Sequence, residues 1–120
     1  MGYGVYTDTH AMYRTVGHVH LDTFVYSVLG DFPDAGLNLI ECADGRWFVE
    51  VDGGGGDTRF DHMHGVSCPN VGPYVEPLFY ADKTSAMMFA LECIKTAYPE
   101  LANLDLQKFA VAYFDEDGDQ

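Results

Sequence analysis

The dipeptide Asp44-Gly45 is the feature that most constrains the fold, because it separates two runs of strand-forming residues. The runs are residues 37–42 and 46–51; the first is rich in Leu and Ile, and the second contains two aromatic and two β-branched residues. Asp-Gly between two such runs is a strong signal for the tight turn of a β-hairpin. The sequence therefore predicts an antiparallel pair of strands near the middle of the chain.

The second strand of this hairpin has a different character on each face. Side chains alternate across a strand, so Trp47, Val49 and Val51 share one face, and Phe48 and Glu50 share the other.

A helix and a strand are predicted after residue 81. Asp82 or Thr84 can cap a helix that ends before Pro99. Its apolar face is formed by residues at helical spacing, namely Met87, Ala90, Leu91 and Ile94. Residues 106–117 then alternate and are rich in aromatic residues, which predicts a strand.

The N-terminal third allows two interpretations. Residues 2–7 are typical of a short strand. Beyond them, either a strand over 12–21 precedes a short helix capped by Asp22, or Thr9 caps one long helix that ends at Gly30. The β-branched residues favour the first alternative, and the apolar stripe of the second half favours the other.

Both alternatives give the order strand, helix, hairpin, helix, strand. This βαββαβ order is that of the ferredoxin-like fold. We therefore predict a single α+β domain over residues 1–120, with an antiparallel sheet and two helices. Residues 53–81, before the second helix, form an insert that is longer than an ordinary connection.

The charge balance restricts the partners. Nineteen acidic residues and six basic ones give a formal net charge of −13, and the sequence pI is 4.3. The basic residues are scattered singly, whereas binding to nucleic acid or to an anionic membrane requires clustered Lys and Arg. We therefore expect a basic protein partner, with no direct nucleic acid and no membrane. The sequence is compatible with a monomer and with a homodimer.

The cysteines indicate a reducing compartment. Cys42, Cys68 and Cys93 are three in number and form no Cys-x-x-Cys pair. The sequence has no signal-peptide pattern at its N-terminus and no long apolar run. We expect free thiols and a cytoplasmic protein, in the host cytoplasm if the protein is viral.

The histidines and one cysteine indicate an alternative function. The chain would then be a metal-binding or small-ligand-binding module, or a small metal-dependent enzyme. In extended chain, the two residues of a His-x-His pair point to the same face and can bind one metal ion. The chain has two such pairs. No cofactor is expected in the main interpretation; in the alternative, the cofactor is zinc, with the ligands His18, His20, His62, His64 and Cys68.

No motif in the chain marks an enzyme. The glycine run at 53–56 is followed by Asp57 and lacks the Gly-Lys-Ser/Thr of a phosphate-binding loop. Residues 114–120 are similar to the start of a calcium-binding EF-hand loop, but the sequence ends before the twelve residues of such a loop are complete. There is no Gly-x-Ser-x-Gly and no context typical of a catalytic cysteine. We therefore expect a protein without catalytic activity.

The acidic residues give the main hypothesis. Carboxylates spaced along a rigid face can imitate the phosphates of nucleic acid and occupy a basic groove. The expected contact residues are Asp31, Asp34, Asp52, Asp57, Asp61, Asp115, Glu116, Asp117 and Asp119. In size, charge and lack of catalytic motifs the chain resembles small acidic inhibitors of phages and mobile elements, such as anti-CRISPR and anti-restriction proteins. That resemblance implies a decoy; adaptation to high salt is the competing explanation of the acidity.

Overall fold

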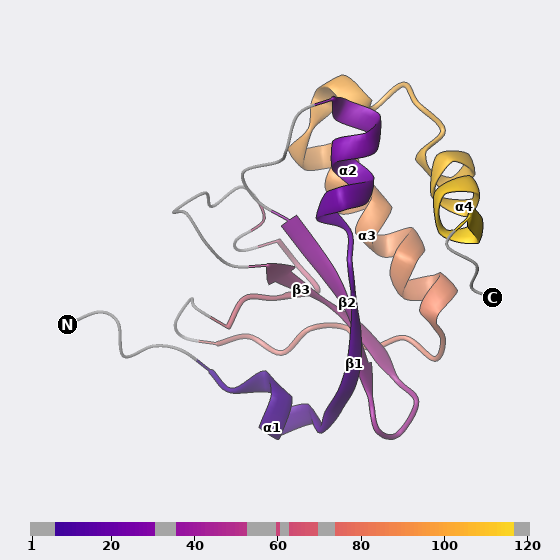
Figure 1. Cartoon of the computed structure of the whole chain (residues 1–120). Helices are drawn as coiled ribbons and strands as arrows, with labels where there is room; N and C mark the ends of the chain where they lie inside the picture. Colours follow the sequence, from indigo (N-terminus) through magenta and orange to yellow (C-terminus); the bar gives the residue numbers. More distant parts are fainter. Residues whose placement is uncertain (1–6, 31–35, 53–59, 61–62, 70–73, 117–120) are drawn as a thin grey trace.

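A four-stranded sheet with the strand order β1-β2-β3-β4 lies at the centre of the computed structural model (Figure 1). The structure describes residues 7–30, 36–52, 60, 63–69 and 74–116, with the backbone alone at 29, 52 and 113–116. The first two strand pairs are antiparallel, and β3 and β4 are parallel. The strands are β1 (Thr15–His20), β2 (Gly36–Cys42), β3 (Trp47–Asp52) and β4 (Val66–Ser67).

The predicted hairpin is confirmed as β2 and β3. The Cys42 amide donates to the Arg46 carbonyl at 2.8 Å, and the Gly45 amide donates to the Cys42 carbonyl at 2.9 Å. Gly45 has φ of 92°, a left-handed conformation that a residue without a Cβ adopts at no steric cost. Asp44 stabilises the same turn, because its carboxylate accepts from the amide of Arg46.

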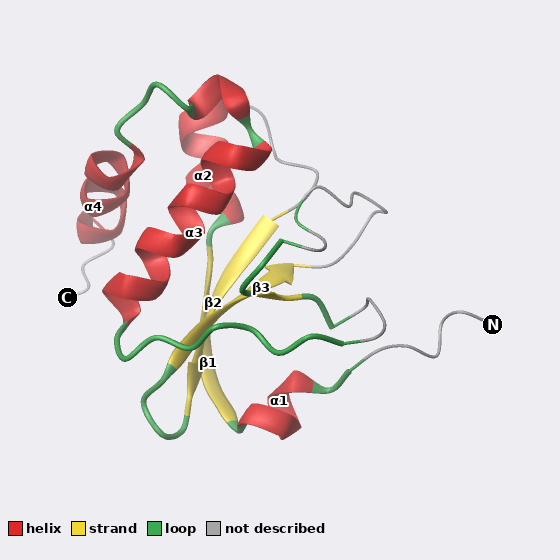
Figure 2. Cartoon of the chain, turned by 180° about the vertical axis from the view of Figure 1, so that it is seen from behind, coloured by secondary structure: helices red, strands yellow, loops and turns green. Residues whose placement is uncertain are grey.

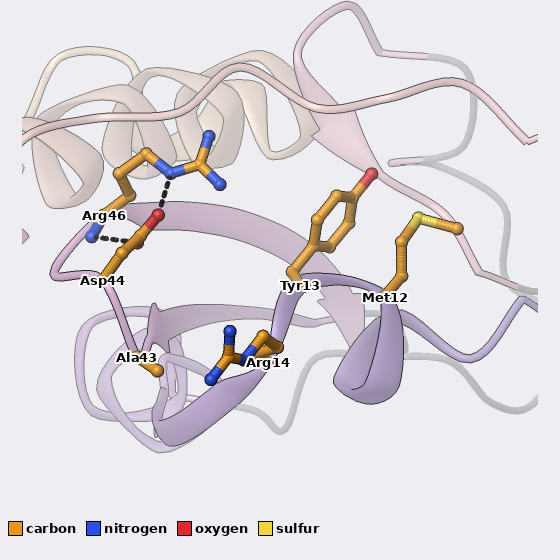
Figure 3. Close-up of a pocket in the computed structure, with 6 residues that line it drawn as sticks. All are labelled: Met12, Tyr13, Arg14, Ala43, Asp44 and Arg46. Atoms are coloured by element: carbon orange, nitrogen blue, oxygen red, sulfur yellow. Dashed lines mark hydrogen bonds and ion pairs between the residues drawn. The ribbon is translucent and has the colours of Figure 1, made fainter.

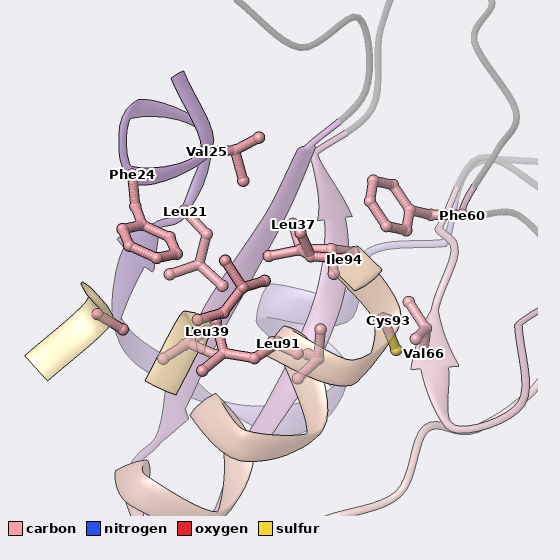
Figure 4. Packing of buried hydrophobic residues seen from close by; sticks show 14 of the residues in the cluster. Leu21, Phe24, Val25, Leu37, Leu39, Phe60, Val66, Leu91, Cys93 and Ile94 are labelled. Atoms are coloured by element: carbon pink, nitrogen blue, oxygen red, sulfur yellow. The ribbon is translucent and has the colours of Figure 1, made fainter. Parts of the chain in front are cut away.

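Three helices cover one face of the sheet. Figure 2 shows α2 (Asp22–Leu29), α3 (Lys83–Ala97) and α4 (Leu106–Glu116) grouped together. α3 contacts β2 and β3, and α4 contacts both α2 and α3. Figure 4 shows the main core between these helices and the sheet, where Leu39 and Ile94 are almost fully buried. Val49 and Val51 are buried in this core and Trp47 packs against it partly buried, so the three residues share one face, as their alternation predicts.

A second, smaller cluster fills the opposite face of the sheet, beside α1 (Thr9–Tyr13). Three of its rings meet edge to face, with centroids 5.1 to 5.5 Å apart. Its members are Ile40, Cys42, Phe48, Tyr13 and Phe79. Both faces of β3 are therefore covered by protein.

The C-terminal strand predicted over 106–117 is wrong, because this segment forms α4. Asp105 accepts from the amide of Lys108 at 3.1 Å and so supplies the first turn with a hydrogen-bond acceptor. Leu106 and Ala110 lie one helical turn apart and are both buried. Packing against α2 and α3 therefore outweighs the preference of the aromatic residues for a strand.

The sheet also differs from the predicted antiparallel one, since β4 runs parallel to β3 and lies inside the 53–81 insert. A bridge between Trp47 and Tyr80 ties the end of this insert to β3. The ferredoxin-like order is not confirmed. Among the described residues, the chain is an α+β domain with a mixed four-stranded sheet and four α-helices.

Of the two N-terminal alternatives, the strand followed by a short helix is the correct one, with β1 before α2. The N-cap of α2 is Leu21, however, and not Asp22, which is the first residue of the helix. The short helix α1 precedes this strand and was not expected. It ends at Arg14, which has a left-handed backbone with φ of 54°. The strand predicted over 2–7 falls, apart from Thr7, outside the described residues.

Candidate functional site

A row of polar side chains crosses the sheet on the face opposite the three helices. The strand pairing places His20 beside Asn38, Asn38 beside Glu50, and Glu50 beside Ser67. Residues paired across neighbouring strands point to the same face. The row begins at the exposed edge strand β1 and ends at the buried residue Ser67.

Glu50 is the buried centre of this row, with 7% of its surface exposed. Its Oε2 accepts from the Thr9 hydroxyl at 2.7 Å and from the Ser67 hydroxyl at 3.0 Å. A buried carboxylate needs such donors, because it has lost the hydrogen bonds of water. Glu50 therefore connects β3 with α1, through Thr9, and with β4, through Ser67.

Tyr74 extends the network from the chain that follows β4. Its hydroxyl lies 2.9 Å from the Ser67 hydroxyl. Burial raises the pKa of Tyr74 well above its usual value, and the Tyr13 hydroxyl and the charge of Glu50 act in the same direction. The phenol thus stays protonated at neutral pH, and the network holds segments together through neutral hydroxyls.

This network could not be predicted from the sequence. Glu50 follows Val49 and precedes Val51, so its alternation is that of a solvent-facing residue on a sheet with one covered face. Glu50 is buried because α1 and the chain through Tyr74 cover the second face. Those contacts join positions that are far apart in sequence.

The first His-x-His pair lies on the exposed side of β1. His18 Nε2 and His20 Nε2 are 3.1 Å apart, and their ring centroids are 4.6 Å apart. His20 Nδ1 lies 2.8 Å from Asn38 Oδ1. The sequence prediction that these two imidazoles share a face is therefore confirmed.

Of the other proposed ligands, the structure describes His64 and Cys68. His64 is exposed in the turn before β4, while His62 falls outside the described residues. The Cys68 sulfur is half-buried, at 4.0 Å from the Phe60 carbonyl and 3.9 Å from that of Val66. Within the part of the chain that the structure describes, no group of three or more His, Cys, Asp or Glu residues is placed to hold a metal ion.

The thiols are free, as the sequence predicts, and two of them are buried. Burial raises the pKa of Cys93 to about 11 and that of Cys42 above its usual value. A thiol with a raised pKa stays protonated at neutral pH and is a poor nucleophile. Cys42 and Cys93 are therefore core residues in this fold.

None of the acidic side chains expected to contact a partner belongs to the described set. The backbone places Asp52 at the end of β3, and Asp115 and Glu116 in the last turn of α4. The remaining residues fall outside the described ranges; they are Asp31, Asp34, Asp57, Asp61, Asp117 and Asp119.

Strand register nevertheless relates two of the acidic groups. Gly36 pairs with Asp52, so the segments 31–35 and 53–59 join the same end of the sheet. The third acidic group, residues 115–119, begins in the last turn of α4. Ala110 and Val111 of this helix line one pocket together with Lys83 at the start of α3. Of the expected contact residues with a described backbone, Asp52 thus lies at one end of the sheet, and Asp115 and Glu116 lie at the end of α4.

Several described carboxylates have a structural task at the start of a helix. Each accepts a hydrogen bond from a nearby backbone N–H, which stabilises the first turn. Such a bond, from the Ser85 amide, lowers the pKa of Asp82. The carboxylates in these positions are Asp8, Asp22, Asp82 and Asp105. Part of the acidity therefore belongs to the fold.

A pocket of about 260 Å³ lies between α1 and the hairpin turn (Figure 3). Arg46 pairs with Asp44 at 2.9 Å, and its guanidinium lies 4.0 Å from the Phe79 ring centroid. The pocket is lined by Met12, Tyr13, Arg14, Ala43, Asp44 and Arg46. It brings together two of the six basic residues, which are far apart in the sequence.

Comparisons with known proteins add no relative. No protein-family model, curated protein or solved structure matches this chain. Among the described helices, none combines the length and the apolar character that a membrane span requires.

Proposed function

We propose that this chain is a small acidic inhibitor without catalytic activity, which occupies the nucleic-acid-binding surface of a basic protein partner. Its net charge of −13 supports attraction to a basic surface. Carboxylates on a folded domain present negative charge at fixed positions, as nucleic-acid phosphates do. The inhibitor acts as a decoy when its carboxylates pair with the Lys and Arg that otherwise bind phosphates.

The observation that carries this proposal is that ion pairs among the described residues neutralise very little of their negative charge. Between two described residues, the structure records a single ion pair, Asp44 with Arg46, and both partners are about half exposed. The described carboxylates that are exposed are Asp8, Asp44, Glu76, Asp82, Glu92, Glu100 and Asp105. Apart from Asp44, none of these carboxylates forms an ion pair with another described residue, so their charge leaves a field that extends into solvent and steers basic partners.

The expected partner is a nucleic-acid-binding protein. We propose a protein that binds DNA or RNA as part of a defence system, such as a CRISPR effector or a restriction enzyme, in the cytoplasm of a host cell. The described domain, with its buried core on both faces of the sheet, provides the rigid support that such mimicry requires. We expect the contact surface to include Asp52, which ends β3, and Asp115 and Glu116 in the last turn of α4.

The test is affinity capture with the immobilised full chain from a nuclease-treated lysate. We expect a basic nucleic-acid-binding protein that is retained at low salt, released at high salt, and eluted by a DNA duplex at low salt. High salt weakens attraction between exposed charges, and DNA competes for the same basic groups. A retained protein that neither salt nor DNA releases would contradict the proposal.

A further inference from the structure

His18 and His20 have the separation of two zinc ligands. Zinc binds imidazole nitrogen at 2.0–2.1 Å, so two such nitrogens around a tetrahedral ion are about 3.3 Å apart. The two Nε2 atoms lie 3.1 Å apart on the exposed side of β1. A small change of either ring therefore admits a metal ion in place of the hydrogen that joins the two nitrogens.

Asn38 orients one of these ligands. Its Oδ1 is an acceptor 2.8 Å from His20 Nδ1, so Nδ1 carries the hydrogen and Nε2 keeps its lone pair. Metal-binding histidines usually donate their second ring N–H to such an oxygen, which fixes both ring and tautomer. Asn38 pairs with His20 across the sheet, so this contact is part of the strand register.

One chain supplies only half of a structural zinc site. Such sites have four protein ligands, and the described residues contain no group of three or more metal-binding side chains. The pair lies on β1, which is the end strand of the sheet and contacts β2 and α1 among the described elements. Among the described residues no strand pairs with the outer edge of β1, so its backbone groups can pair with a second strand.

We propose that His18 and His20 form half of a zinc site, which the same two residues of a second copy complete across the outer edge of β1. A twofold contact between identical edges repeats every residue on both sides, so two pairs provide four imidazoles. The ion also adds positive charge between two chains that each carry −13 and repel one another. Zinc therefore promotes a dimer that the protein alone disfavours.

The test is titration of the metal-free full chain with Zn²⁺, with calorimetry for stoichiometry and light scattering for mass. We expect one zinc per two chains and conversion of monomer to dimer. His18→Ala and His20→Ala should abolish both effects, and Asn38→Ala should weaken zinc binding by about tenfold. Both histidines are exposed, so these variants should keep the circular dichroism spectrum of the unaltered protein.

His10→Ala and His64→Ala are the matched controls, because each removes an exposed imidazole outside the pair. Both controls should bind zinc and dimerise like the unaltered chain. Zinc binding of one ion per chain without dimerisation contradicts the role of the second copy. Binding that survives in His18→Ala and is lost in His64→Ala contradicts the site itself. The titration needs no basic partner, so its outcome is independent of the proposed decoy function.

Discussion

Replacing Asp115, Glu116 and Asp117 with lysine is expected to slow association with the captured partner by roughly tenfold or more at low salt. The variant changes attraction to repulsion at residues 115–117, which begin in the last turn of α4. Electrostatic steering acts mainly on the association rate, whereas short-range contacts govern dissociation. Stopped-flow mixing over a range of salt concentrations measures the effect, and the salt dependence of the rate should decrease.

A matched control separates the position of the charges from their number. Glu76→Lys, Glu92→Lys and Glu100→Lys together change the net charge by the same amount, at exposed residues outside the expected contact groups. This control should slow association much less than the variant of the acidic end. Equal slowing by the two variants contradicts the assignment of that end to the contact surface, and an unchanged rate in the first variant removes it from the account.

Phe48→Ala is expected to lower the free energy of unfolding by about 3–5 kcal/mol. Phe48 is fully buried at 0% exposure. Its ring contacts Tyr13 from α1 at 5.2 Å and Phe79 at 5.5 Å between centroids. The truncation leaves a cavity in the smaller of the two clusters, and the loss is a large part of the roughly 5–15 kcal/mol that stabilises a typical domain. Urea unfolding followed by circular dichroism measures it.

Phe109→Ala is the matched control for this prediction. Phe109 is an identical side chain on α4, with 46% of its surface exposed. Its truncation should change the free energy of unfolding by well under 1 kcal/mol. Equal losses in the two variants would mean that the second face of the sheet is not closed by protein.

The hairpin and α3 could be predicted because their signals are local. Asp44-Gly45 specifies a tight turn, and Gly45 adopts the left-handed conformation that this turn requires. Asp82 caps α3 through the amide of Ser85, and Leu91 and Ile94 are buried in the core as their spacing predicts. In each case a few neighbouring residues carry the information.

α4 could not be recognised because two patterns compete in one segment. Aromatic and β-branched residues between 106 and 117 favour a strand, while Leu106 and Ala110 lie at helical spacing. The contacts with α2 and α3 decide in favour of the helix. Asp105 was the overlooked signal, since its carboxylate accepts from a backbone amide of the first turn.

The candidate sites could be predicted only in part. The shared face of His18 and His20 follows from strand alternation, whereas their contact with Asn38 depends on the register between β1 and β2. The burial of Glu50 depends on Thr9, which lies 41 residues away. The role of the acidic contact residues stays a prediction.

The most direct test of the decoy function is the displacement of nucleic acid from the captured partner. Fluorescence anisotropy of a labelled DNA duplex or RNA strand, already bound to that partner, is measured as this protein is added at low salt. We expect the anisotropy to fall to that of free nucleic acid near one equivalent, because both ligands need the same Lys and Arg. Anisotropy that stays high or rises, as in a ternary complex, would contradict the account.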